Sequence, residues 1–200
     1  MDAFDSPLID EQLSALLGDL KRAVEVSHQR RVFCNRNLKM EHIEVIGFDM
    51  DYTLALYNQR AMERFSVDMS IDRMVTQFGF PEEIRKLKYK SNYAVRGVVV
   101  DQKLGNVFKM DRHGHIGRVF HGTRLLSPEE RRRKYRNSRV QLSHSRYVWI
   151  DTLFGTPEAV MYMTLVDYLE KKGGKPDFGE LFSAIRKSID QIHRDGTLKT

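Results

Sequence analysis

The sequence predicts an α/β protein in which a short buried strand is followed by a larger region of helices and β-hairpins. Residues 43–48 form an apolar run rich in β-branched residues, and this run is too short for a helix. Between residues 98 and 120, short apolar runs separated by glycine-containing turns predict a β-meander of about three strands. The chain has 200 residues, of which 41% are hydrophobic, which suits one domain or slightly more.

Helices are expected on both sides of the predicted strand. Residues 7–26 carry a leucine stripe that follows Ser6, a candidate N-cap, and Pro7, which suits a first helical turn. Such a stripe most often docks on a core, although a partner-binding helix is an alternative. After the strand, we expect short helices at residues 70–79 and 81–90, separated by a glycine.

The meander and the segment after it carry histidines and arginines. His113, His115 and His121 lie at turns and lack the spacing and the second carboxylate of zinc ligands, so we interpret them as turn residues. Residues 131–139 hold five arginines and a lysine around Tyr135. Basic residues beside an aromatic can follow a phosphate backbone. The favoured interpretation is an exposed charged helix or loop of the cap, which could lie at a subunit contact of a homo-oligomer. A pocket for an acidic effector is a weaker alternative.

The remainder predicts a strand at residues 147–150 and two helices. Thr156 is expected to cap the first helix, which ends near residue 172 before two glycines.

The last helix, residues 178–195, has one apolar stripe. Arg186, Asp190 and His193 follow one another at i, i+4 and i+7, so they share a neighbouring face. Spacing alone favours an exposed ion pair with an incidental histidine.

Two carboxylates end the predicted strand. In an open α/β sheet, ligands gather beyond the carboxyl ends of the strands, where Asp49 and Asp51 fall. Such a pair can bind Mg²⁺. Asp49 can attack phosphorus and Asp51 can act as general acid and base, while the metal offsets the developing charge. The alternative is a solvated strand-to-loop junction, because Asp is common at turns.

The string Phe-Asp-Met-Asp-Tyr-Thr-Leu-Ala at residues 48–55 resembles the first motif of the haloacid-dehalogenase-like phosphatases, closest to the cytosolic purine 5′-nucleotidase branch. Similar strings lie at residues 35–40, 96–97, 105–106 and 151–154, so the resemblance covers roughly residues 30–200. It implies a Rossmannoid core, present only in its N-terminal part, with a mixed helical and β-hairpin cap. Residues 1–56 would hold the first core strand and the catalytic loop, and residues 57–200 the cap.

The resemblance also assigns roles. Asp49 would be nucleophile and metal ligand, and Asp51 general acid/base and metal ligand. On the other side of the site, the residues matching those that hold the nucleotide are Phe154, Arg186, Asp190, His193 and Lys199. The implied activity is Mg²⁺-dependent hydrolysis of a purine nucleoside monophosphate such as IMP or GMP, through an aspartyl-phosphate intermediate.

The chain departs from this family in its later part. We find no apolar strand followed by a Ser or Thr motif after residue 172, and no Asp-Asp pair anywhere. We therefore expect an N-terminal piece with half an active site and negligible turnover alone. Gln141 stands where the branch usually has an Arg, so allosteric activation is not carried over.

Composition narrows the class of protein. Lys and Arg number 33 against 27 acids, and this formal charge of +6 suits anionic substrates without indicating nucleic acid. Cys34 is the single cysteine, which suits a cytoplasmic protein, and no long apolar run indicates a membrane span. Two other hypotheses remain: a non-catalytic module that binds nucleotides or RNA, and a related phosphatase acting on a sugar phosphate.

Overall fold

The structure is a computed structural model that describes residues 27–31, 43–88, 90, 92–136 and 140–196. The chain divides into two compact units, Met1–Phe48 and Asp49–Thr200. In the first unit, His28–Arg30 form the short 3₁₀-helix η1. The helix predicted at residues 7–26 lies outside the described residues.

Residues 43–48, predicted as a buried strand, form no strand in the described structure. Val45 is 84% exposed and Phe48 is 71% exposed. A strand becomes stable when neighbouring strands take up its backbone hydrogen bonds and cover its apolar side chains. The prediction of a buried strand here is therefore wrong for this chain, because the apolar pattern lacks the neighbours it needs.

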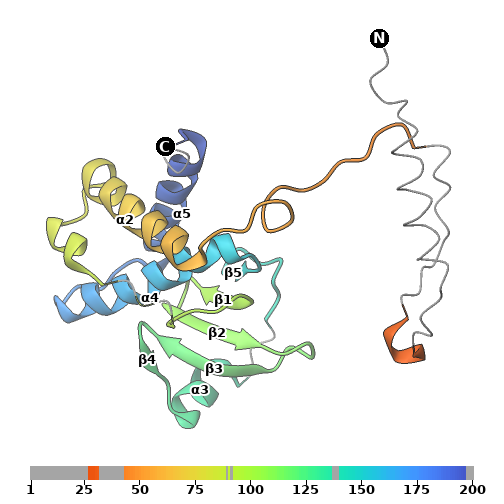
Figure 1. Ribbon diagram of the computed structural model, residues 1–200. Coiled ribbons are helices and arrows are strands. Elements are labelled where there is room, and N and C mark those ends of the chain that lie inside the picture. Colours follow the sequence, from red (N-terminus) through yellow and green to blue (C-terminus); the bar gives the residue numbers. More distant parts are fainter. Residues whose placement is uncertain (1–26, 32–42, 89, 91, 137–139, 197–200) are drawn as a thin grey trace, which may run out of the picture. The chain divides into compact units, whose positions relative to one another are not determined.

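The second unit is built on a five-stranded antiparallel sheet with the order β4-β3-β2-β1-β5 (Figure 1). Its strands are β1 (Val98–Asp101), β2 (Asn106–Met110), β3 (Ile116–His121), β4 (Arg124–Leu125) and β5 (Tyr147–Ile150). The predicted meander is confirmed as β1 to β3. The later strand β5 returns to pair with β1, where Trp149 lies opposite Val99. The α/β class is thus confirmed in the form of an open antiparallel sheet with helices.

The helices of this unit are α2 (Gln59–Phe78), η3 (Glu82–Lys86), α3 (Pro128–Tyr135), η4 (Leu153–Gly155), α4 (Thr156–Lys171) and α5 (Phe178–Arg194). Helix α2 begins at Gln59 rather than Ser70, because the Asn58 side chain accepts a hydrogen bond from the Ala61 amide and caps it. It ends at Gly79, with φ of 70°, as predicted.

Two predicted details of the helices differ from the structure. The helix predicted at residues 81–90 is only the short 3₁₀-helix η3. Thr156 is the first residue of α4 and not its cap, which is Gly155. The Thr156 hydroxyl donates instead to the Leu153 carbonyl, at 2.7 Å. Of the basic segment, the residues up to Tyr135 lie in helix α3, in which Ser127 and Glu130 make a reciprocal capping box.

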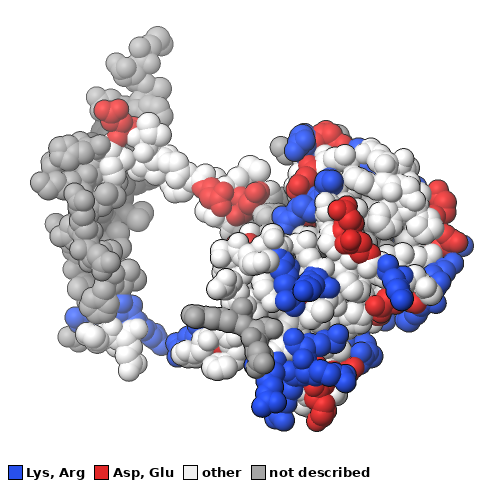
Figure 2. Space-filling view, turned by 180° about the vertical axis from the view of Figure 1, so that it is seen from behind, with Lys and Arg blue, Asp and Glu red and all other residues white. Residues whose placement is uncertain are grey.

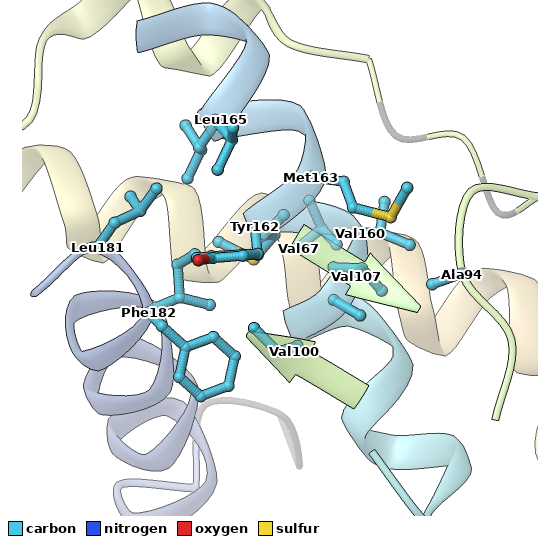
Figure 3. Close-up of a cluster of buried hydrophobic side chains, with 14 of the residues drawn as sticks. Val67, Ala94, Val100, Val107, Val160, Tyr162, Met163, Leu165, Leu181 and Phe182 are labelled. Carbon is cyan, nitrogen blue, oxygen red and sulfur yellow. The ribbon is translucent and has the colours of Figure 1, made fainter. Parts of the chain in front are cut away.

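One face of the sheet packs on α2, α4 and α5. Alternate residues of β1 point to this face, so Val98 and Val100 lie in the main core with Tyr162 of α4 and Phe182 of α5. The Tyr162 and Phe182 rings meet edge to face, with centroids 5.6 Å apart (Figure 3). This core places α4 and α5 side by side and so fixes the end of the sheet from which the candidate site is built.

The opposite face of the sheet packs on α3. Val99 and Phe108 lie there with Tyr135, whose ring meets Phe108 at a centroid distance of 5.4 Å. On the same face, the fully buried Asp101 carboxylate accepts from Arg146 Nε at 2.8 Å and from Nη2 at 2.7 Å. The Tyr135 hydroxyl donates to this carboxylate at 2.8 Å. Every oxygen of this buried charge is therefore paired, as burial requires.

We predict that Asp101→Ala lowers the free energy of unfolding by about 3 kcal/mol or more, because it leaves Arg146 without its buried partner. Equilibrium urea denaturation measures the change. Asp68→Ala is the control, because Asp68 forms only an exposed i,i+4 pair with Arg64, and it should cost about 0.5 kcal/mol or less. Similar losses in the two variants would contradict the role given to Asp101.

Candidate functional site

A pocket of about 260 Å³ opens where β5, η4, α4 and α5 meet. We call it the α5 pocket. Four of the sequence-predicted residues line it: Phe154, Arg186, Asp190 and His193. The remaining lining residues are Trp149, Ile150, Asp151, Thr152, Gly155, Glu158 and Ile189. The structure therefore brings together one aromatic from η4 with three polar residues from α5.

Helix α5 presents its polar residues through its amphipathic pattern. Asp177 caps the helix by accepting from the Gly179 and Glu180 amides, at 2.9 and 3.0 Å. The buried stripe of α5 faces the core and consists of Leu181, Phe182, Ile185, Ser188, Ile189 and Ile192. Because residues three or four apart share a face, burial of this stripe leaves the polar residues along one edge of the pocket.

His193 has a defined tautomer when neutral. Its Nδ1 lies 2.8 Å from the Ile189 carbonyl oxygen, which can only accept a hydrogen bond. Nδ1 must therefore carry the proton, and Nε2 of the neutral ring is left as an acceptor. This orientation holds the imidazole ring at the pocket lining rather than leaving it to rotate freely.

Phe154 joins the pocket to the loop that carries the two predicted catalytic acids. Its ring lies 5.6 Å from the Tyr52 ring and 6.4 Å from the Tyr57 ring, measured between centroids. The Tyr57 hydroxyl donates to Asp51 at 2.6 Å. This hydrogen bond, with the charges of Asp51 and Asp49 adding to it, raises the pKa of Tyr57. Asp51 is thus one hydrogen bond and one ring contact away from the pocket aromatic.

The acid-bearing loop is a tight turn. The Met50 carbonyl accepts from the amides of Leu54 and Ala55, at 3.0 and 2.8 Å. Tyr52 adopts φ of 59°, and it is the one non-glycine with positive φ among the described residues. Such a conformation costs free energy and is found at functional turns more often than elsewhere. The turn brings the Tyr52 ring into contact with Phe154.

Hydrogen bonds tie this turn to the start of α4. The Tyr52 hydroxyl donates to Gln59, and Gln59 Nε2 donates to Glu63 at 2.6 Å. The Thr156 hydroxyl reaches the same Glu63 oxygen at 2.9 Å. Glu63 is only 8% exposed. The turn, α2 and α4 therefore share one buried polar network, which holds the acid loop beside the pocket.

The carboxylates of Asp49 and Asp51 are exposed, and no ion pair reaches either one within the part of the chain that the structure describes. Two uncompensated carboxylates of this kind fit Mg²⁺, which uses one or two acids and takes its other oxygens from water and a substrate phosphate. Among the described residues, no group of three or more metal-ligating side chains occurs. Asp49 and Asp51 could each supply one carboxylate to such an ion.

An ion pair between the buried Glu158 and the partly exposed Arg186 contributes to the lining of the α5 pocket. Glu158 is 4% exposed, and its Oε2 lies 2.8 Å from Arg186 Nη2. Within the described residues, this oxygen accepts no hydrogen bond of good geometry, although it lies in ion-pair contact with Arg186. Burial raises the pKa of Glu158 to about 7, although Arg186 opposes the shift and Asp190 adds to it. The pair engages Nη2 of Arg186, and the guanidinium of this pocket residue carries further donors.

Comparisons with known proteins bear on this site. Residues 32–200 match the model of the 5′ nucleotidase family. The chain belongs to the 5′ nucleotidase family. A 5′-nucleotidase domain-containing protein of Dictyostelium discoideum is 27% identical over 187 residues, which cover 89% of this chain and 32% of that protein. The chain thus spans about a third of the length of that relative.

Two pocket residues of this family chain were missed by the sequence analysis. Trp149 lines the pocket from the edge strand β5 and is 52% exposed. Glu158 lies in the first turn of α4 and is 4% exposed. The sequence contains a clue to Glu158, because it is the one charged residue between Thr156 and Val166. An acid inside an apolar helical segment needs a partner.

Other predictions have different outcomes. Lys199 lies outside the described residues. His121 is no free turn residue, because its ring bonds Asn106 at 2.8 Å and Glu170 at 2.9 Å. A search for membrane spans found no helix among the described residues with the length and apolar character required to cross a bilayer.

We predict that the free energy of unfolding of this protein falls as pH rises from about 4.5 to 7, because Glu158 loses its proton over this range. The folded protein keeps the Glu158 proton up to a pKa of about 7, whereas the unfolded chain loses it near the ordinary value of 4.5. Folding is therefore favoured below this window, by up to about 3 kcal/mol relative to pH 8. Glu158→Gln should remove this contribution, so the variant gains stability relative to wild type as pH rises.

Urea denaturation of both proteins across this pH range measures the difference. Glu180→Gln is the matched control, since Glu180 is exposed on α5 and makes no pocket contact. The Glu180 variant should track wild type at every pH. If the Glu158→Gln curve also ran parallel to wild type, Glu158 would not titrate in this window.

Proposed function

We propose that the chain is the nucleotide-recognising part of a Mg²⁺-dependent 5′-nucleotidase of the haloacid-dehalogenase-like type, purine branch. Its substrate would be a purine nucleoside monophosphate with a 6-oxo group, such as IMP or GMP. Membership of the 5′ nucleotidase family supports the general activity. The observation that carries the finer proposal is the gathering of Phe154, Arg186, Asp190 and His193 around one pocket next to the acid-bearing turn.

The pocket chemistry suits a 6-oxo purine. The guanidinium of Arg186 can donate to the base O6, as arginine does to guanine. The Asp190 carboxylate can accept from the N1–H that a 6-oxo purine carries. Phe154 and the imidazole of His193 both line the pocket and offer flat surfaces for stacking on the base. A 6-amino purine presents the opposite donor and acceptor pattern, so it would leave both charged groups with the wrong partner.

The acid-bearing turn suits the phosphate end of the same ligand. Asp49 would attack phosphorus to form an acyl phosphate, and the bond from phosphorus to the 5′ oxygen would break. Asp51 would give a proton to that leaving oxygen and later take one from the attacking water. The hydrogen bond from Tyr57 holds the Asp51 carboxylate in place. A bound Mg²⁺ would supply charge stabilisation for the phosphoryl oxygens.

The segment around the acids suits docking to further core strands. Six large apolar side chains between residues 45 and 56 are at least 60% exposed, namely those of Val45, Ile46, Phe48, Met50, Leu54 and Leu56. A run of this kind is costly to leave in water and suits a strand buried within a parallel sheet. We propose that it becomes the first strand of a Rossmannoid core when the remaining strands of that core are supplied.

We predict that IMP binds this chain and changes the fluorescence of Trp149. Trp149 is the single tryptophan and lines the α5 pocket, so its emission reports on occupancy. IMP should bind at least about tenfold more tightly than AMP, which corresponds to about 1.4 kcal/mol. Asp190→Ala should reduce IMP affinity by a similar factor and narrow the IMP-to-AMP ratio.

Two controls make the titration decisive. Glu180→Ala removes an acid from the same helix outside the pocket and should leave IMP affinity unchanged. Ribose 5-phosphate tests the sugar-phosphatase alternative because it lacks the base. Equal binding of ribose 5-phosphate and IMP would overturn purine recognition, as would an Asp190 variant that still discriminates IMP from AMP.

We predict negligible turnover by the 200-residue chain. Beyond Asp49 and Asp51, its sequence lacks the Ser or Thr motif and the Asp-Asp pair that a phosphatase of this type uses. Phosphate released from IMP in the presence of Mg²⁺ should not exceed that of the Asp49→Asn variant. Release that depends on Mg²⁺ and disappears in the variant would show instead that these residues suffice for catalysis.

A further inference from the structure

The positive charge of this chain is concentrated in one segment. Residues 109–136 hold nine Lys or Arg and three Asp or Glu, a surplus of six. The whole chain has a formal charge of +6, so all other residues balance. Figure 2 shows the Lys and Arg side chains crowded at the foot of the second unit, where Figure 1 places α3. A local surplus of this size favours an anionic ligand at that place.

Two of the three acids in the segment, Glu130 and Asp111, already accept several hydrogen bonds. Glu130 accepts from both Arg124 nitrogens at 3.0 and 3.1 Å and from the Ser127 amide at 2.8 Å. These bonds lower the pKa of Glu130 to about 2. Asp111 accepts from the amides of His113 and His115, at 2.8 and 2.9 Å. The hydrogen bonds of these two carboxylates are therefore made to Arg124 and to backbone amides, and not to Arg132 or Arg136.

Those arginines line a second pocket, of about 270 Å³, which we call the basic pocket. Its lining residues are Gly114, His115, Ile116, Arg131, Arg132, Tyr135 and Arg136. The side chains of Arg132 and Arg136 are exposed, and they make no hydrogen bond or ion pair within the described part of the chain. Two cations at positions i and i+4 repel each other, so an anion bound between them would reduce this electrostatic repulsion. None of these residues belongs to the α5 pocket.

Both walls of the basic pocket are fixed before any ligand arrives. On one side, α3 is held by its capping box and by the buried Tyr135 hydroxyl, which bonds Asp101 and Asn106 at 2.8 Å each. On the other side, the turn from β2 to β3 is closed by the bond from the Asp111 amide to the His115 carbonyl, at 3.0 Å. Arg131 bridges the two walls by donating to the Gly117 carbonyl at 2.8 Å. A pre-formed site loses little free energy to ordering on binding.

We propose that the basic pocket binds a compact anion with two or more linked phosphate groups. The planar guanidinium groups of Arg132 and Arg136 match phosphate oxygens in a bidentate manner. The pocket has the volume of a small ligand rather than the length of a polymer groove. Tyr135 is 6% exposed, so the imidazole of His115 is the single accessible ring in the pocket lining, and no row of rings is offered for successive bases of a nucleic-acid strand. The recognised chemistry is therefore the polyphosphate group itself.

Isothermal titration calorimetry of the full chain with inorganic tripolyphosphate tests the proposal. Tripolyphosphate should bind at least about tenfold more tightly than orthophosphate at the same salt concentration. Arg132→Gln combined with Arg136→Gln should lose at least about tenfold of that affinity. Both side chains are exposed and lack bonds, so the double variant should fold as wild type does, which its urea midpoint checks.

The matched control is Lys171→Gln combined with Lys187→Gln, which removes two exposed charges outside the pocket. It should bind tripolyphosphate as wild type does. An equal loss in the control would show that net charge, not the pocket, attracts the anion, and would overturn the proposal. So would unchanged affinity in the arginine variant, or tighter binding of a single-stranded RNA oligonucleotide than of tripolyphosphate.

Discussion

The buried carboxylate of Asp101 is the interaction on which the rest of the second unit depends. It lies at the end of β1, fully removed from water, and its partners come from the two segments that flank the sheet. Arg146 leads into β5, and Tyr135 ends α3. The Asp101 carbonyl also accepts from Tyr162 of α4, at 3.4 Å. A charge placed there requires all of these groups at once, so it selects one arrangement of sheet and helices.

This arrangement fixes two surfaces with different chemistry. Through Arg146 and β5, it sets where Trp149 and η4 emerge, and hence where the α5 pocket opens. Through Tyr135, it sets the position of α3 and the arginines of the basic pocket. The two pockets share no lining residue, yet both rest on the same buried pair. Rigid support of this kind favours recognition of small, charged ligands.

Much of the unit could be predicted from local patterns, and the failures have physical causes. The meander was predictable because turn glycines and period-two apolar residues act locally, as at Gly105 between β1 and β2. The face of α5 was predictable because 3.6-residue periodicity sets it. The start of α2 was not, since its first turns are mostly polar and depend on the Asn58 cap and on packing. The prediction of a strand at residues 43–48 was wrong because a strand needs neighbouring strands to pair with.

The sequence by itself determined the local elements, the family resemblance and the candidate residues from Asp49 to His193, because spacing and residue type suffice for these. Only the tertiary structure decided that Phe154 lies against the tyrosines of the acid-bearing turn. It also decided that Glu158 pairs with Arg186, and that Arg131, Arg132 and Arg136 line one pocket. These facts join residues far apart in the chain. Long-range packing around one buried charge creates them, and no local pattern encodes that packing.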